Sequence, residues 1–362
     1  MEIHCSSLAR PMACAGFLSF ENLPKFESGA AAEEGTAAGE LLERMLLSKD
    51  LPFQAKNGVY FNDDMKFYLK PIVEEINANK SGDVLCEQKI DWLSRSGVWI
   101  RGKYDISFVR DGCLYVDDLK YGWGIVEVRD NWQLLGYAIG EVIRRGIAFE
   151  KIVLRIHQPR PHHEDGSTRV WELSYNELLA YKEKIDSRFE QIVAGYNRLE
   201  SGKQCKYCAA APEACPAFNR LFYRALEVST DFVQDQINEN EIAEQLDHAA
   251  RAQEVLKIKM DSLSQLAISR ISSGRIIPGY SQQASYGDRT WKGAVSPEVI
   301  KTLTGKDILT SVMLSPAKAE KIGIPKDFVN ALVDRKFLGN KLTRKNSKDS
   351  ADKAFGTEAP KL

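Results

Sequence analysis

Two strand-like runs that meet at Asp111-Gly112 constrain the fold of this chain more than any other feature. The runs read VWIRGKYDISFV and CLYVDDLKY. Asp-Gly between such runs indicates a two-residue type I′ turn, because both central residues of that turn need a positive φ. Counted back from this turn, the pairing sets Asp105 opposite Asp118. A three-residue loop would break this pairing.

Strand alternation then sorts the charges of the second run. Asp118 and Lys120 share one face of the strand with Asp105 opposite, and Asp117 points to the other face. Directly opposed residues have Cβ atoms about 4.5–5.5 Å apart, so the hairpin places two carboxylates side by side. Such a pair repels unless a cation lies between the carboxylates or one is protonated, and oxygen ligands suit Mg²⁺ or Mn²⁺. The alternative is an Asp–Lys–Asp network on a half-exposed sheet.

The composition narrows the class of protein. The chain has 362 residues, 44% apolar and 27% charged, which suits two or three folded units with a sizeable core. The net charge of −1 gives no global signature of a nucleic-acid binder, so any DNA contact requires local patches. No apolar run of about 18 residues exists, and the first residues lack the basic and apolar regions of a signal peptide. These features predict a cytoplasmic protein that does not enter a membrane.

The remaining pattern predicts an α/β fold followed by a helical extension. Helices are expected at 30–48, 62–78, 132–145 and 174–199, with Asn131 as an N-cap, and strands within 84–128 and at 151–159. Three-and-four spacing predicts one long helix over 232–272, and 275–333 suits a small α+β module. The histidines His162 and His163 lie in a Pro-rich loop without companion ligands, which favours an exposed loop over a metal site.

Three short motifs occur in a specific order. They are GKYD at 102–105, DLK at 118–120 and QLLGY at 133–137, where Gln133 and Tyr137 share a helix face. Alone, packing would explain this Gln/Tyr pair. Together, the three motifs resemble the RecB-type branch of the PD-(D/E)XK nuclease superfamily, which has a Gly-x-x-Asp strand, an Asp-x-Lys strand and a Gln-x-x-x-Tyr helix in that order.

The resemblance implies a restriction-endonuclease-like core, a mixed β-sheet flanked by helices, that holds Mg²⁺ or Mn²⁺. Its metal ligands would be Asp105, Asp118 and the backbone carbonyl of Leu119, and Lys120 would be the catalytic lysine. Gln133 and Tyr137 would line the site and contact DNA. We further expect Lys103, Arg129 and Arg155 to steer the DNA backbone through salt-sensitive contacts.

One position departs from the pattern of this branch. The upstream motif Gly-Thr-x-x-His-x-x-x-Glu is matched by GTAAGELLE at Gly35, Thr36 and Glu43, but Gly39 occupies the histidine position. That histidine is commonly a metal ligand. Either water, Glu40 or Glu43 fills the position here, or metal binding is weakened.

The cysteines form a second candidate site. A metal-ligand spacing is shared by Cys205, Cys208 and Cys215, but no fourth cysteine lies nearby in the sequence. Two interpretations stay open: a zinc site completed by histidine or water, and free thiols. The RecB-type resemblance implies a 4Fe-4S cluster, held by one cysteine before the nuclease core and three after it. Cys14 lies in the matching N-terminal position, and Cys5 is the alternative. The implied role is structural, joining the N-terminal segment to the end of the nuclease domain.

The resemblance therefore implies a metal-dependent DNA nuclease, an exonuclease of the phage-encoded kind, that acts in DNA recombination or end processing in the host cytoplasm. A single-strand annealing protein is the implied partner. The expected domains are a nuclease domain at 1–225, a helical linker at 226–274, a small module at 275–334 and a basic, disordered tail at 335–362. The alternatives are a catalytically impaired nuclease-fold DNA-binding scaffold, motivated by Gly39, and a metal-stapled structural protein.

Overall fold

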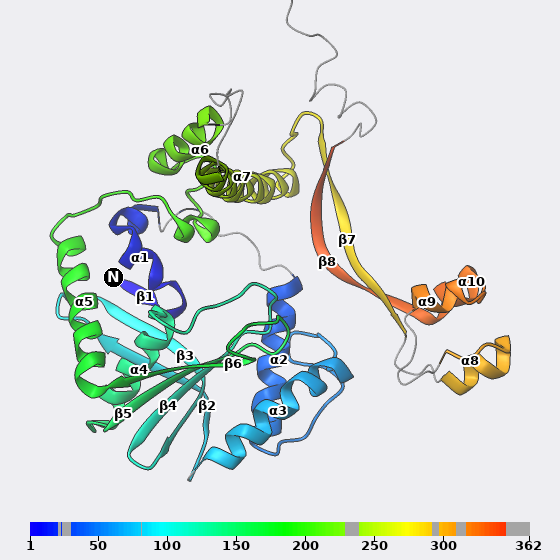
Figure 1. The fold of residues 1–362 in the computed structure, drawn as a ribbon, viewed down its shortest axis with the longest axis horizontal. Helices are drawn as coiled ribbons and strands as arrows, with labels where there is room; N and C mark the ends of the chain where they lie inside the picture. Colours follow the sequence, from blue (N-terminus) through cyan, green and yellow to red (C-terminus); the bar gives the residue numbers. More distant parts are fainter. Residues whose placement is uncertain are drawn as a thin grey trace, which may run out of the picture. The chain divides into compact units, whose positions relative to one another are not determined.

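The computed structural model describes residues 1–20, 23, 30–80, 82–228, 239–291, 297–308 and 316–344. The chain divides into two compact units, Met1–Leu263 and Ser264–Leu362. The first unit is an α/β fold in which helices flank a mixed sheet (Figure 1). Within the described residues, no helix is long and apolar enough to cross a membrane.

The sheet of the first unit has the order β1-β3-β4-β5-β6, with β2 paired to β3. Its strands are β1 (Glu2–His4), β2 (Leu85–Leu93), β3 (Trp99–Arg110), β4 (Cys113–Leu119), β5 (Lys151–His157) and β6 (Thr168–Ser174). β2 and β4 run antiparallel to β3, β5 runs parallel to β4, and β6 runs antiparallel to β5. β1 pairs with β3 as far as Arg101, and β4 pairs with β3 from Ile106 onward. Residues 102–105 of β3 therefore lie between the stretch that pairs with β1 and the stretch that pairs with β4.

The predicted hairpin register is confirmed. The ladder runs from Arg110↔Cys113 to Ile106↔Asp117, and the turn residues Asp111 and Gly112 have φ of 49° and 73°. The ladder ends one pair before Asp105 and Asp118. The two aspartates thus lie at the point where the pairing of β3 with β4 ends.

Helices cover both faces of this sheet. α2 (Ala30–Leu46) and α3 (Asp63–Asn79) pack on one face, and α4 (Trp132–Arg145) and α5 (Tyr175–Val193) pack on the other (Figure 1). Local signals set their ends. Asn131 accepts hydrogen bonds from the backbone N–H groups at the start of α4, and Ser174 forms a capping box with Glu177 at the start of α5. The sequence predicted these starts.

Short helical segments join the N-terminus to the end of this unit. They are η1 (Cys5–Ser7), α1 (Ala9–Ala13), η2 (Ala15–Phe20), η3 (Lys203–Tyr207) and α6 (Pro216–Val228). The long helix α7 spans Glu239–Ser272, and the part of its predicted span before 239 lies outside the described residues. Ile258 of α7 packs into a small core with Phe218 of α6. The helix predicted at 174–199 ends early, because Gly195 adopts a φ of 98° and accommodates the chain reversal.

The second unit pairs a long β-ribbon with short helices. Strands β7 (Tyr280–Trp291) and β8 (Val333–Arg344) are antiparallel, and helices α8 (Pro297–Thr304), α9 (Pro316–Lys321) and α10 (Lys326–Leu332) accompany them. The prediction of a disordered tail from 335 is wrong as far as Arg344. Backbone pairing with β7, from Val333 with Trp291 to Arg344 with Tyr280, makes this stretch a strand. Residues 345–362 lie outside the described residues.

Candidate active site and cysteine cluster

Asp105 and Asp118 meet at the point where β3 and β4 separate. Asp118 is 2% exposed and Asp105 is half-buried, and Asp105 Oδ2 accepts a 2.7 Å hydrogen bond from the backbone N–H of Leu119. Burial, and next the negative charge of Asp118, raise the pKa of Asp105 well above its ordinary value. The two neighbouring carboxyl groups therefore repel each other when both are ionised, and a nearby cation relieves that repulsion.

A lysine and an amide complete this site. Lys120 Nζ lies 2.7 Å from Asp118 Oδ2 and donates a 2.9 Å hydrogen bond to Gln133 Oε1. The other end of the Gln133 amide donates to Asp118 Oδ1 at 3.0 Å and to the Tyr137 hydroxyl at 2.8 Å. Burial lowers the pKa of Lys120, but the charge of Asp118 outweighs it, so the pKa is raised and the lysine stays cationic. Gln133 therefore fixes the acid, the lysine and the phenol relative to one another.

Two motif glycines explain why α4 approaches the sheet so closely. A Cβ at Gly102 would lie 2.6 Å from Tyr137 Cε1, and one at Gly136 would lie 2.9 Å from Cys5 Sγ. Both distances are too short for non-bonded atoms, so a side chain at Gly102 would push α4 away from β3, and one at Gly136 would push α4 away from Cys5. The glycines of the first and third motifs thus bring Tyr137 and Gln133 within reach of the carboxylates.

The upstream helix α2 brings one more acid toward the site. Burial, and next the charges of Glu43, Glu87 and Asp105, raise the pKa of Cys86 to about 12, so these acids surround one thiol. Glu43 Oε1 accepts a 2.8 Å hydrogen bond from Lys49. Gly39 lies one helical turn before Glu43, and nothing lies within 4 Å of a Cβ built there.

Glu40 is already committed to other partners. Its Oε1 accepts 3.0 Å and 2.8 Å hydrogen bonds from Arg44, and its Oε2 accepts a 2.8 Å bond from the Lys56 N–H. Of the two acids that could replace the missing histidine, Glu43 is therefore the better placed.

Glu87 is an acid near the site that the sequence did not reveal. It lies in β2, pairs with Lys103, and its charge contributes to the raised pKa of Asp105. Its φ of 55° is unusual for a residue inside a strand, and a non-glycine residue in this region costs about 1–3 kcal/mol. The β2–β3 register, with Cys86 opposite Ile106 and Gln88 opposite Tyr104, sets Glu87 opposite Asp105.

Asp117 lies on the opposite face of β4 and belongs to a separate buried network. Its two carboxylate oxygens accept 2.8 Å and 2.5 Å hydrogen bonds from Arg155, and Oδ2 lies 3.1 Å from His157 Nε2. Arg155 is 4% exposed, so the expectation that it steers DNA is wrong, because burial and Asp117 hold it inside the fold. Lys103, a second residue expected to steer DNA, forms an ion pair with Glu87. Arg129, the third, is exposed.

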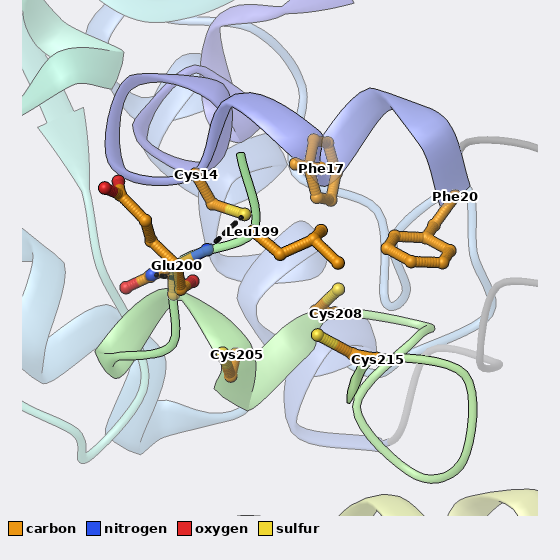
Figure 2. A pocket seen from close by; sticks show the side chains of 9 residues that line it. Cys14, Phe17, Phe20, Leu199, Glu200, Cys205, Cys208 and Cys215 are labelled. Atoms are coloured by element: carbon orange, nitrogen blue, oxygen red, sulfur yellow. Dashed lines mark hydrogen bonds between the residues drawn. The ribbon is translucent and has the colours of Figure 1, made fainter. Parts of the chain in front are cut away.

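The four predicted cluster cysteines line one pocket (Figure 2). Cys14, Cys205, Cys208 and Cys215 surround a cavity of about 20 Å³, with Phe17, Phe20 and Leu199 among its apolar walls. Three sulfurs accept backbone N–H groups: Cys14 from Glu200 at 3.4 Å, Cys205 from Gly202 at 3.5 Å and Cys215 from Phe218 at 3.5 Å. Burial, and next the neighbouring thiols, raise the pKa of Cys205 to about 11.

The structure also decides between the two N-terminal cysteines. Cys5 is fully buried between Gly102 and Gly136, where burial raises its pKa to about 12, and it is not among the residues that line the cysteine pocket. Cys14 is therefore the N-terminal member of the cluster. His162 is exposed and His163 half-exposed. Across the described part of the chain, no three His, Cys, Asp or Glu side chains are arranged to hold one metal ion.

Comparison with known proteins identifies a family. A family model described as "Protein of unknown function (DUF2800)" matches residues 2–341. A solved structure titled "Crystal structure of SSO0001" is 15% identical, and the match covers 60% of this chain and 86% of that chain with a TM-score of 0.31. This likeness is too low to transfer any property to the present chain.

Proposed function

The chain belongs to the DUF2800 family, whose function is unknown. From the chemistry of the site we propose that the chain is a divalent-metal-dependent deoxyribonuclease. The observation that carries this proposal is the pair Asp105 and Asp118, whose carboxylates repel each other unless a cation lies nearby. The cationic Lys120 is held beside Asp118. A surface ion network would not bury these charges. The restriction-endonuclease-like fold is part of the proposal, supported by the α/β sheet and the order of the motifs.

The chemistry of the donor atoms suits Mg²⁺ or Mn²⁺, because Asp105 and Asp118 offer carboxylate oxygens. The carbonyl of Leu119 and the carboxylate of Glu43 are further candidate ligands. A divalent ion bound there would supply Lewis acidity and a more acidic water. In hydrolysis, a water oxygen bonds to phosphorus, the bond from phosphorus to the leaving oxygen breaks, and that oxygen takes up a proton.

The protein's own side chains then divide the remaining tasks. Lys120 is held cationic, so it is suited to donate a hydrogen bond to a phosphate oxygen or to the attacking water rather than to remove a proton. Gln133 holds Lys120 and Asp118 in place, and Tyr137 is positioned by the same amide. Replacing the Gln133 amide should therefore release Lys120 from its fixed position while leaving the fold intact.

Cleavage of end-labelled linear DNA and of circular DNA, side by side with Mg²⁺ or Mn²⁺, tests the proposal. Activity on linear DNA alone identifies an exonuclease, and activity on circles identifies an endonuclease. Lys120→Met should lower the rate by at least about 100-fold, as expected for loss of one catalytic group. Lys89→Met, at an exposed lysine on β2, is the matched control and should cleave like the wild type.

Gly39 supports a second candidate, a DNA-binding scaffold of the same fold that no longer cleaves. The position offers no side chain to a metal, and the space around it is open. Gly39→His separates the two candidates. If the wild type is inactive and Gly39→His cleaves, the scaffold reading holds, and if the wild type cleaves, it fails.

For the cysteine pocket we propose a 4Fe-4S cluster, with zinc as the alternative. Four cysteines that line one pocket, with backbone N–H groups directed at three of the sulfurs, suit thiolate ligation. The cluster would join the N-terminal segment to the segment near 198, where Gly16 N–H already bonds to the Arg198 carbonyl at 2.9 Å. Anaerobic purification followed by a visible spectrum and metal analysis tests this. A colourless protein with stoichiometric zinc would contradict iron.

The biological setting rests on the motif resemblance. We propose that DNA is the substrate and that the activity serves recombination or the processing of DNA ends, beside a single-strand annealing protein.

A further inference from the structure

An aromatic pair directly follows the candidate catalytic lysine. The rings of Tyr121 and Trp123 enclose the guanidinium of Arg160, whose Cζ lies 4.7 Å and 4.6 Å from the two ring centroids. Tyr121 is buried, whereas Trp123 is 61% exposed. Arg160 thus supports the indole from one side, and much of the indole surface faces solvent.

The loop that carries Trp123 is held from beneath. Gln158 is fully buried, and its Nε2 donates to the carbonyls of Gly122 at 3.0 Å and Gly124 at 2.8 Å, on either side of the tryptophan. Its Oε1 accepts the Val126 N–H at 3.1 Å, and Arg169 donates to the Val126 carbonyl at 2.6 Å. Such a loop presents a large ring in a fixed position, which lowers the entropy lost when a ligand binds.

Trp123 lies close to the reacting groups. It follows Lys120 by three residues, so their Cα atoms are at most about 11 Å apart. The aromatic row also continues in the other direction. Tyr68 of α3 meets Tyr121 at 6.4 Å between ring centroids and Phe67 at 5.5 Å, and Phe67 is 73% exposed.

We propose that Trp123 stacks on an unpaired base of single-stranded DNA beside the scissile phosphate. This inference rests on the proposed nuclease function and names its substrate class. Within a strand, away from its ends, only an unpaired base exposes its flat face to a protein ring, because the internal bases of a duplex stack on one another. Arg160, which also pairs with Glu34 at 2.9 Å, lies against the indole, and Lys120 precedes Trp123 by three residues. An apolar protein partner would not require these cations. An exposed ring backed by a cation is also the arrangement that suits sequence-independent strand binding.

The test is binding of a labelled oligothymidine, compared with an abasic oligonucleotide of equal length, by fluorescence anisotropy in EDTA. Trp123→Ala should weaken binding of oligothymidine by about 5- to 150-fold, the loss expected for one stacked base. Binding of the abasic strand, which has the same charge, should not change. Trp123→Phe should restore most of the affinity. Trp99→Ala, at a tryptophan that is 39% exposed on β3, is the control and should change neither.

Equal weakening for both strands, or no weakening for either, would overturn the inference. Because EDTA prevents cleavage, this outcome is separate from the fate of the nuclease proposal. If the wild type cleaves DNA and Trp123→Ala binds both strands as the wild type does, the stacking proposal fails and the nuclease proposal stands. Base-dependent binding by a protein that never cleaves supports stacking and refutes the nuclease.

Discussion

Replacing Asp117 with asparagine should destabilise the fold strongly, whereas the same change at Asp118 should not. Asp117 is fully buried, and in Asp117→Asn the guanidinium of Arg155, at 4% exposure, would lose the opposite charge and keep at most one of its two hydrogen bonds to that side chain. Breaking a buried ion pair costs about 3–5 kcal/mol, because the remaining charge stays buried. Glu75 still contacts Arg155 at 2.9 Å, so the lower end, about 3 kcal/mol, is expected.

At Asp118 two effects offset each other. Asparagine removes the repulsion with Asp105, but it also removes the attraction to Lys120, which is 27% exposed and therefore partly screened. The free energy of unfolding should change by about 1 kcal/mol or less.

Urea denaturation at pH 7 measures both changes, and equal slopes of the two curves would show that the unfolded states are comparable. A loss at Asp118 as large as that at Asp117 would refute the assignment of the two aspartates to opposite faces with different roles.

Three further predictions concern other parts of the first unit. Gly136→Ala should cost about 1–3 kcal/mol by overpacking against Cys5, and an unchanged Tm would contradict the close approach of α4. Burial raises the pKa of Glu141, but hydrogen bonds from Arg144 and Arg145 outweigh burial and hold that pKa below 4.5. The ionised carboxylate therefore stabilises the fold above pH 4.5, and this stabilisation is lost as the pH falls. The stability gap between the wild type and Glu141→Gln should therefore shrink below pH 4.5, and a constant gap in denaturant titrations would contradict the pairing. Cys215→Ser should remove the visible absorption of anaerobically purified protein, and retained colour would exclude this ligand.

Much of the sheet and its helices could be predicted, because short-range chemistry specifies them. The Asp111-Gly112 turn set the hairpin register, and the caps at Asn131 and Ser174 set two helix starts. The short strand β1, by contrast, has no pattern of its own and exists only because the start of β3 offers it a free edge. The end of α5 was missed although Gly195 was visible as a stop signal.

The candidate site shows the same division. Asp105, Asp118, Lys120, Gln133 and Tyr137 come together as the motif order predicted. The buried partnership of Arg155 with Asp117 was not predictable, because it depends on which strand lies beside β4 in the sheet. Glu87 was missed for a related reason, because its position opposite Asp105 depends on the register between β2 and β3.

The measurement that tests the account most directly is Mn²⁺ binding followed by DNA cleavage in the same samples of wild type, Asp118→Asn and Asp91→Asn. Asp91 is exposed on β2 and serves as the matched control. The account predicts that wild type and Asp91→Asn bind Mn²⁺ and cleave, while Asp118→Asn stays folded, binds Mn²⁺ more weakly and loses cleavage by at least about 100-fold. Cleavage by Asp118→Asn at the wild-type rate, or a folded wild type that neither binds Mn²⁺ nor cleaves, would contradict it.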